Sequence, residues 1–244
     1  IREGRGVGKD SDHIHLHLEH LDPGLVSERL PGISETARIF AGVDVNKQPI
    51  PVIPTCHYNM GGVPTNYHGE VVTLQDGDMD HVVPGLLAIG EAACVSVHGA
   101  NRLGSNSLLD LVVFGRAAAN RAAEIVRPGM AHKSIADTAC EIALTRLDKF
   151  RNANGNTPTS KMRLEMQRIM QNHCAVFRTE ESLDEGLAKL EELWSCRHDI
   201  RVSDRSMIWN TDLIETMELD NLLFQALCNM RGAAHRKESR GAHA

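Results

Sequence analysis

The spacing of apolar residues changes near Gly129, and this change constrains the fold more than any other feature of the chain. Before Gly129, short β-like runs are separated by Gly and Pro. Beyond Pro128-Gly129, apolar residues recur with the 3.6-residue period of amphipathic helices. Helices with one apolar stripe and short connections pack as antiparallel bundles. We therefore predict a mostly helical α+β fold in which mixed α/β segments precede an antiparallel helical bundle.

Four apolar stripes are expected to form the core of that bundle. Asn154-Gly155 and Pro158 end the first stripe, and Gly232 is expected to stop the last helix. The stripes comprise Ile135, Ala139, Ile142, Leu147 and Phe150; Met162, Met166, Ile169 and Met170; Leu183, Leu187, Leu190 and Trp194; and Leu213, Met217, Leu223, Leu227 and Met230.

Three strands and one long helix are expected before Gly129. Residues 13–18 alternate between His and an aliphatic residue, which is the period of a half-buried strand. Residues 70–74 and 86–89 are two further strand candidates, with Pro84-Gly85 as a turn before the second. Residues 107–126 have the composition of a helix, and several Ala residues would let one face approach another element closely.

His13, His15 and His17 would lie on one face of the first strand, and Glu19 continues that face. This row could bind a metal, but three imidazoles in a straight strand lie too far apart to converge without a bend. We interpret the row as a solvated strand face and predict no metal site.

Charge and cysteine usage exclude several classes of protein. The formal net charge is −6, and no basic segment extends beyond residues 231–240, so a nucleic-acid interface is not expected. The longest apolar run, residues 108–114, falls short of the roughly 18 residues of a membrane span and contains Asp110. Six scattered cysteines without a C-x-x-C pair are typical of reduced thiols rather than a disulfide framework.

The run from Pro84 to Ala92 ends a buried strand with Gly90 followed by Glu91. A carboxylate at this point lies at the C-terminal edge of a sheet, where α/β proteins bind ligands, and it can accept hydrogen bonds from ribityl or ribose hydroxyls. An exposed Glu that merely caps a strand end would give the same pattern.

Residues 98–109 form a Gly- and Asn-rich loop that runs directly into a helix. Backbone N–H groups at such a helix start, together with the helix dipole, favour negative charge nearby. An ordinary helix capped by Asn106 or Ser107 is the alternative interpretation. Arg102 argues against that alternative, because a cap needs no guanidinium, whereas the planar fork suits a carboxylate.

A third cluster is the run from Pro54 to Gly62, in which His57 precedes the glycine pair Gly61-Gly62. A histidine beside two glycines fits a tight site where backbone approaches a ligand. A lone histidine is also a common structural residue, so this cluster carries little weight by itself.

The order and spacing of these three motifs resemble the succinate dehydrogenase and fumarate reductase flavoprotein subunit family. The resemblance rests on His-Tyr-Asn-Met-Gly-Gly at 57–62, Gly-Glu-Ala at 90–92 and His-Gly-Ala-Asn-Arg-Leu-Gly-Ser-Asn-Ser-Leu at 98–108. It covers essentially the whole chain, including residues 31–44 and 236–243. Within the family, residues 108–115 are most similar to succinate dehydrogenase.

The resemblance implies an architecture and a role for each matching residue. Residues 1–56 would complete a capping domain, residues 57–117 would return to the FAD-binding domain, and residues 118–244 would form the helical domain. Glu91 would hydrogen-bond the FAD ribityl chain, and Ser107 with Leu108 would lie at the flavin. His57 and Arg102 would hold the carboxylates of the substrate.

The resemblance also implies the reaction and its setting: oxidation of succinate to fumarate in the tricarboxylic acid cycle, with hydride transfer to FAD. Electrons would pass to an iron–sulfur subunit and then to quinone. The protein would be peripheral, held through partner and membrane-anchor subunits at the cytoplasmic face of a bacterial inner membrane or the matrix side of the mitochondrial one. The family's dinucleotide fingerprint and its arginine base would precede Ile1, so no catalytic residue is assigned here, and the 244-residue chain alone is expected to bind FAD weakly or not at all and to be inactive.

Other interpretations remain open at this point. Fumarate reductases and L-aspartate oxidases have the same loop and clamp, although Met60 disfavours the aspartate oxidases. A non-catalytic helical fragment that only binds partners is an alternative of a different class.

Overall fold

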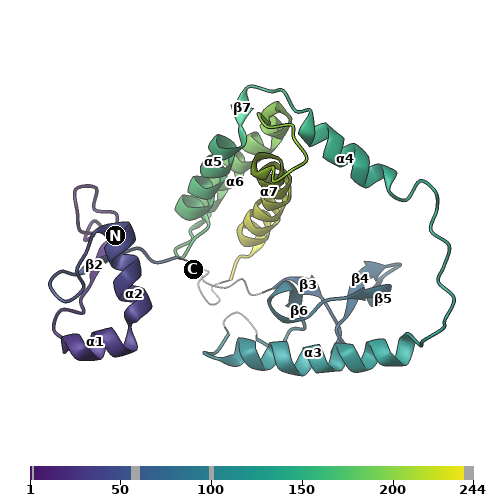
Figure 1. Ribbon diagram of the computed structural model, residues 1–244, viewed down its shortest axis with the longest axis horizontal. Helices are drawn as coiled ribbons and strands as arrows, with labels where there is room; N and C mark the ends of the chain where they lie inside the picture. Colours follow the sequence, from purple (N-terminus) through teal and green to yellow (C-terminus); the bar gives the residue numbers. More distant parts are fainter. Residues whose placement is uncertain (2, 56–60, 99–101, 239–244) are drawn as a thin grey trace. The chain divides into compact units, whose positions relative to one another are not determined.

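A computed structural model describes residue 1 and residues 3–55, 61–98 and 102–238 of the chain (Figure 1). Its contacts divide the chain into two units, Ile1–Thr55 and Cys56–Ala244. Each unit has its own elements and its own buried residues.

The first unit combines a two-stranded sheet with short helices. Strand β1 (Ile14–Leu16) pairs antiparallel with β2 (Ile50–Val52), which confirms the strand predicted around the histidines. Between the two strands lie α1 (Pro23–Arg29), α2 (Pro31–Thr36) and the π-helix η1 (Ala37–Ala41). The core of this unit consists of Val26, Ala37, Val45 and Ile50.

The histidine row is spread along the strand rather than gathered at a point. Ring centroids of consecutive histidines are 5.7 and 6.0 Å apart. The outer two imidazoles each have a carboxylate neighbour, since His13 Nδ1 lies 2.7 Å from Asp12 and His17 Nδ1 lies 2.5 Å from Glu19. In the ranges that the structure describes, no group of three His, Cys, Asp or Glu side chains could hold a metal ion.

The second unit begins with a hairpin made of β4 (Glu70–Gln75) and β5 (Asp78–Leu87). The strand predicted at residues 70–74 is confirmed. The turn predicted at Pro84-Gly85 is wrong, because both residues lie within β5. The chain turns instead at Asp76-Gly77, where both φ angles are positive (52° and 86°), as a tight two-residue hairpin turn requires. Pro84 is tolerated in β5 because a two-stranded sheet leaves each strand one unpaired edge.

Helix α3 (Asn106–Ile125) follows a short parallel pairing of β3 (Val63–Pro64) with β6 (Ala93–Cys94), and it confirms the helix predicted at residues 107–126. One face of α3 packs on the strand ends, where a Cβ at Gly69 would lie 3.0 Å from that of Ala118. The other face leaves Leu108, Leu109, Val112 and Val113 exposed. Among the described residues, no helix combines the length and hydropathy needed to cross a membrane.

Four helices make up the remainder of the second unit: α4 (Glu141–Arg151), α5 (Thr159–His173), α6 (Glu180–Ser195) and α7 (Thr211–His235). Strands β7 (Thr157–Pro158) and β8 (Ile200–Arg201) pair in parallel, and the 3-10 helix η3 (Cys196–Asp199) precedes β8. The predicted stripes of α5, α6 and α7 are confirmed, because these helices share one core. Its most deeply buried members are Met162, Leu190, Leu219, Leu223 and Met230.

The first predicted stripe is correct only at its end. Residues 131–136 lie outside any helix, and α4 begins at Glu141. Ile135 and Ile142 are 81% and 84% exposed, whereas Leu147 and Phe150 pack on the core. A helical spacing of apolar residues forms a stable helix only where another element packs against those residues. In the described structure, the N-terminal residues of this stripe, Ile135 and Ile142, are exposed. Gly232 does not stop α7, which continues to His235.

The domain limits inferred from the resemblance stay predictions. The limit placed after Ala117 falls within α3, which is continuous from Asn106 to Ile125.

The loop before α7 presents a tryptophan to solvent. Trp209 is 94% exposed and has a φ of 51°, in the left-handed region. The loop is nevertheless held by hydrogen bonds, because Asn210 Nδ2 donates to the carbonyls of Asp204 (2.7 Å) and Ser206 (2.9 Å). The same Asn210 caps α7 by accepting from the Leu213 N–H.

Two features bring the central helices unusually close together. A Cβ on Gly186 of α6 would lie 2.4 Å from the Cβ of His173 and 2.9 Å from the terminal methyl of Met230, so only glycine fits there. Thr216, fully buried on α7, donates to the Asp212 carbonyl (2.7 Å). Since its single hydroxyl hydrogen is used in that bond, the 2.6 Å contact with Thr159 requires Thr159 to donate.

We predict that Gly186→Ala lowers the free energy of unfolding by about 1–3 kcal/mol, because the added methyl overpacks the junction of three helices. Gly232→Ala on α7 is the matched control, since a Cβ there meets nothing within 4 Å. The control should gain up to about 1 kcal/mol from helix propensity. Urea unfolding of both variants measures the difference, and equal stabilisation by both would contradict the close packing at Gly186.

Candidate functional site

Parallel pairing of β3 with β6 brings two of the predicted motifs together. The Thr65 N–H donates to the Cys94 carbonyl at 3.1 Å, which extends the pairing by one residue. Strand β3 directly follows the segment that carries His57, and β6 directly follows Glu91. His57 itself lies outside the described residues, but the chain emerging from it runs beside the strand end at Glu91.

Gly62 makes this approach possible. Its φ is 133°, and a Cβ there would lie 2.7 Å from the carbonyl oxygen of Ala92. The neighbour is backbone rather than a flexible side chain, so it could not move aside. Gly62 therefore lets two chain segments approach closely, whereas the approach of backbone to a ligand predicted for the glycine pair stays a prediction.

Glu91 lies in the 3-10 turn η2 (Gly90–Ala92) and its side chain is exposed. The preceding Ile89 is extended, and Gly90 turns the chain with a φ of 63°. A Cβ on Gly90 would lie 2.2 Å from a methyl of Leu111, so α3 packs directly over this turn. The carboxylate of Glu91 is thus displayed at a strand end, where it can accept hydrogen bonds from a ligand.

The start of α3 differs from the capped helix of the alternative interpretation. The N-cap residue is Ser105, with a φ of 67°, whereas Asn106 and Ser107 are already helical. Among the described residues, no side chain caps this terminus by a hydrogen bond. An N-terminus without a side-chain cap retains N–H groups that a ligand can use.

Ser107 and Leu108, predicted to lie at the flavin, are on different faces of α3. Ser107 is only 9% exposed, on the face that packs on the strand ends, while Leu108 is 65% exposed. The N–H of Leu108 donates to the Ser105 carbonyl at 3.2 Å. Arg102, the predicted carboxylate ligand, is half-buried in the irregular segment just before α3.

A hydrogen bond between His98 and Asp110 was not predicted from the sequence. His98 Nε2 lies 2.7 Å from Asp110 Oδ2, on the second turn of α3, and Asp110 is 7% exposed. The sequence signal was the charge itself, since Asp110 interrupts an otherwise apolar run and a buried carboxylate needs a partner. The identity of that partner depends on the path of the loop.

A salt bridge between Arg121 and Glu70 joins α3 to the hairpin. Glu70 of β4 is buried and accepts from Arg121 Nε (2.8 Å) and Asn66 Nδ2 (2.9 Å). Asn66 Oδ1 in turn accepts from the N–H groups of His68 and Glu70. Hydrogen bonds from Asn66 and Arg121 lower the pKa of Glu70 below its ordinary value of 4.5, so it is ionised at neutral pH.

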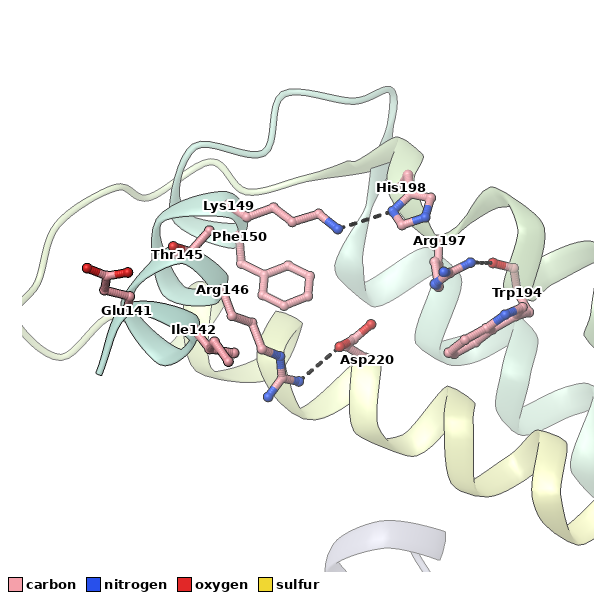
Figure 2. A pocket seen from close by; sticks show the side chains of 10 residues that line it. All are labelled: Glu141, Ile142, Thr145, Arg146, Lys149, Phe150, Trp194, Arg197, His198 and Asp220. Atoms are coloured by element: carbon pink, nitrogen blue, oxygen red, sulfur yellow. Dashed lines mark hydrogen bonds and ion pairs between the residues drawn. The ribbon is translucent and has the colours of Figure 1, made fainter. Parts of the chain in front are cut away.

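A separate hollow of about 610 Å³ lies among α4, the end of α6, η3 and α7. The side chains that line it are drawn in Figure 2. Arg146 spans it to reach Asp220 at 2.9 Å, and Arg197 lies 4.0 Å over the ring of Trp194. The charge of Arg197, burial and the charge of Lys149 lower the pKa of His198. Of the predicted site residues that the structure describes (Glu91, Arg102, Ser107 and Leu108), none lines this hollow, which is lined by Glu141, Ile142, Thr145, Arg146, Lys149, Phe150, Trp194, Arg197, His198 and Asp220.

Two family models match the chain. The model described as an FAD binding domain matches residues 1–108, and the model described as the fumarate reductase flavoprotein C-terminus matches residues 163–244. Together they cover both the candidate site and most of the helical bundle.

Relatives of known name match the chain along its whole length. The mitochondrial succinate dehydrogenase flavoprotein subunit of Oryza sativa subsp. japonica is 66% identical over all 244 residues, and that of Rickettsia conorii is 62% identical. These matches cover 39% and 41% of the two relatives, so the chain spans about two fifths of their length. The E. coli quinol fumarate reductase flavoprotein superposes with a TM-score of 0.83 at 39% identity, over 99% of this chain and 40% of that one.

We predict that the packing of α3 on the hairpin weakens in acid. Because the pKa of Glu70 is lowered in the folded state, its contribution to stability is present above the ordinary pKa and is lost as pH falls through the folded one. Between about pH 5 and pH 3, amides of β4 and β5 should lose hydrogen-exchange protection, after correction for intrinsic rates, relative to α6. In Glu70→Gln, the protection of β4 and β5 should differ much less between acid and neutral pH. If the protection of that variant kept the wild-type pH dependence, another group would be its cause.

Proposed function

The chain belongs to the succinate dehydrogenase and fumarate reductase flavoprotein family, and from this membership we propose that the full-length protein is the FAD-dependent flavoprotein subunit of a succinate dehydrogenase. The observation that carries the proposal is the convergence at the β3–β6 pairing. There the segment from Gly61 into β3 runs beside the Glu91 turn, and α3 packs over the same turn with its N-terminus just beyond Arg102.

The residues present fit part of an FAD molecule. The exposed carboxylate of Glu91 can accept hydrogen bonds from ribityl hydroxyls. The N-terminus of α3, without a side-chain cap among the described residues, offers N–H groups and positive dipole potential to an electron-rich ring edge. At Gly62 and Gly90 the absence of a Cβ lets neighbouring segments pack closely, since a Cβ at either position would collide with Ala92 or Leu111. We assign Glu91, Ser107 and Leu108 to cofactor binding, with Ser107 and Leu108 contributing from the first turn of α3.

When bound, FAD would supply the hydride acceptor for oxidation of the substrate. The residues of this chain would position that substrate. We assign one carboxylate of a four-carbon dicarboxylate to Arg102, whose fork can donate two parallel hydrogen bonds, and the other to His57. Gripping both ends fixes the orientation of the reacting C–H bonds, and orientation alone can supply several kcal/mol of the barrier reduction. The positive charge of Arg102 would also stabilise negative charge that develops on the substrate carboxylate.

The partners and location follow from the same proposal. An iron–sulfur subunit would accept the electrons, and membrane-anchor subunits would hold the complex at a bacterial inner membrane or the mitochondrial inner membrane. The exposed apolar face of α3, which includes Leu109, Val112 and Val113, would be covered by other parts of the full-length flavoprotein.

Fumarate reduction is the alternative that one observation favours, namely the TM-score of 0.83 with the quinol fumarate reductase flavoprotein. The same clamp would serve either direction, because both reactions share one dicarboxylate pair. Initial rates of succinate oxidation and of fumarate reduction by the full-length complex would separate the two functions.

We predict that Arg102→Lys in the full-length subunit cripples turnover far more than flavin content. Lysine keeps the charge but loses the two-pronged grip, and displacement of the substrate by about an ångström can cost on the order of a hundredfold in rate. The loss should appear in kcat as well as KM, because the clamp both binds and orients the diacid. Turnover per bound flavin, measured with a dye acceptor, is the readout. Loss of flavin with normal turnover in the remaining holoenzyme would make Arg102 a cofactor residue instead.

Glu91→Gln should show the opposite pattern. The amide still accepts a hydrogen bond but is neutral, so it holds ribityl hydroxyls less strongly than a charged acceptor does. We expect a several-fold increase in the rate of flavin release, with smaller changes in turnover per bound flavin. Spectrophotometric flavin content after dialysis, alongside wild type, measures the difference. A fall in turnover at full flavin occupancy would contradict the assignment.

A further inference from the structure

We propose that the hydrogen bond between His98 and Asp110 is a positioning device that holds the Arg102 segment against helix α3. This inference rests on the function proposed for Arg102, because its effect on activity would arise through the carboxylate grip. The bond itself is a feature of the described structure and can be tested independently of activity.

The chemistry of the pair makes it a firm anchor. Asp110 is buried on α3, with its side chain only 6% exposed, while the His98 side chain is 17% exposed. A buried carboxylate left without a donor is costly, so loss of the partner would drive local rearrangement. When the Asp110 carboxylate is ionised it can only accept, and Nε2 of His98 then carries the hydrogen of the 2.7 Å contact.

The position of the bond in the chain gives it its role. His98 precedes Arg102 by four residues and Asp110 follows it by eight, so the two bonded residues flank Arg102 in the sequence. On the helix side, the Asn106 N–H donates to the Leu103 carbonyl at 3.2 Å. Arg102 therefore lies between an anchored histidine and an anchored helix start.

The backbone on both sides of this segment is in an uncommon conformation. Ser96 has a φ of 66° and Ser105 a φ of 67°, both in the left-handed region that L-residues seldom adopt. Such conformations persist only where surrounding contacts enforce them. The His98–Asp110 bond is one such contact, since it ties the first of the two bends to the helix that begins at the second.

Asp110 is in turn held by the rest of the site. It lies next to Leu111, whose methyl packs over Gly90 in the turn that carries Glu91. The bond thus fixes the segment that carries Arg102 relative to α3, the same helix that covers the Glu91 turn. Pre-organisation of this kind lets a ligand bind without first ordering the loop.

The test compares His98→Ala, which removes the donor, with His98→Gln, whose amide can donate from nearly the position of Nε2. Asp110→Asn is a third variant that keeps an acceptor without the charge. His173→Ala in α5 is the control, because His173 is also half-buried and hydrogen-bonded (Nδ1 to the Ser182 carbonyl, 3.1 Å) but lies on the bundle helices. All four are made in the full-length subunit.

The first readout is hydrogen exchange of the amides of residues 102–106 without substrate. We expect exchange in His98→Ala to be at least tenfold faster, in His98→Gln to be intermediate, and in the His173→Ala control to match wild type. The second readout is kinetic: KM for succinate should rise and kcat per bound flavin should fall by roughly tenfold or more in His98→Ala, with partial recovery in His98→Gln.

The outcomes separate this inference from the proposed function. Unchanged exchange in His98→Ala overturns the inference. A second result also overturns the inference: His98→Ala exchanges faster but keeps wild-type kinetics, while Arg102→Lys has impaired turnover. The anchor would then not position the arginine. Faster exchange with unchanged kinetics in both His98→Ala and Arg102→Lys retains the anchor and refutes the substrate role of Arg102. Should His98→Ala fail to fold, His98→Gln and Asp110→Asn decide by the same two readouts.

Discussion

The candidate site depends on a backbone contact that only glycine permits. Where the chain leaves the His57 segment, Gly62 passes so close to the Ala92 carbonyl that no side chain could be accommodated. This approach aligns β3 with β6 and sets the segment beside the Glu91 turn. Helix α3 then packs over the same turn at Gly90. The two glycines thus hold β3, the Glu91 turn and α3 close together, because neither contact has room for a side chain.

Sequence patterns predicted elements well where burial decides the structure, and poorly where a partner or a turn decides it. Helices α5, α6 and α7 were predicted correctly because each buries a full apolar stripe in one shared core. The stripe around Ile135 and Ile142 failed, since an apolar period carries no information on whether a neighbour covers it. Pro84-Gly85 was a poorer turn signal than Asp76-Gly77, which supplies two positive φ angles. Of the candidate site, the residue types and their order could be predicted, but the bond from His98 to Asp110 could not, because it depends on the path of the intervening loop.

The acidic residues around α3 divide into two roles according to burial. Glu70 and Asp110 are buried, and each is bound by donors on another segment, so they join elements to one another. Glu91 is exposed at a strand end and is available to a ligand. The oxygens of a buried carboxylate need hydrogen-bond donors from the protein, so such a carboxylate fixes the segments that supply those donors. An exposed carboxylate is hydrogen-bonded to water and can exchange that water for a ligand at little cost in free energy. Both kinds are needed if a binding group is to be displayed on a rigid frame.

The placement of the two tryptophans has a consequence for spectroscopy. Trp194 lies beneath the Arg197 guanidinium near the end of α6, and Trp209 is almost wholly in solvent in the loop before α7, so both lie beyond residue 140. Intrinsic tryptophan emission therefore reports on those helices and is silent about the strands and the α3 terminus where the candidate site lies. The two indoles should also differ in emission maximum and in accessibility to collisional quenchers. Iodide should therefore quench the emission of Trp209 more strongly than that of Trp194. A denaturation curve recorded by fluorescence would follow the bundle alone, and an optical probe of the site would have to be introduced near Tyr67 or supplied by a bound chromophore.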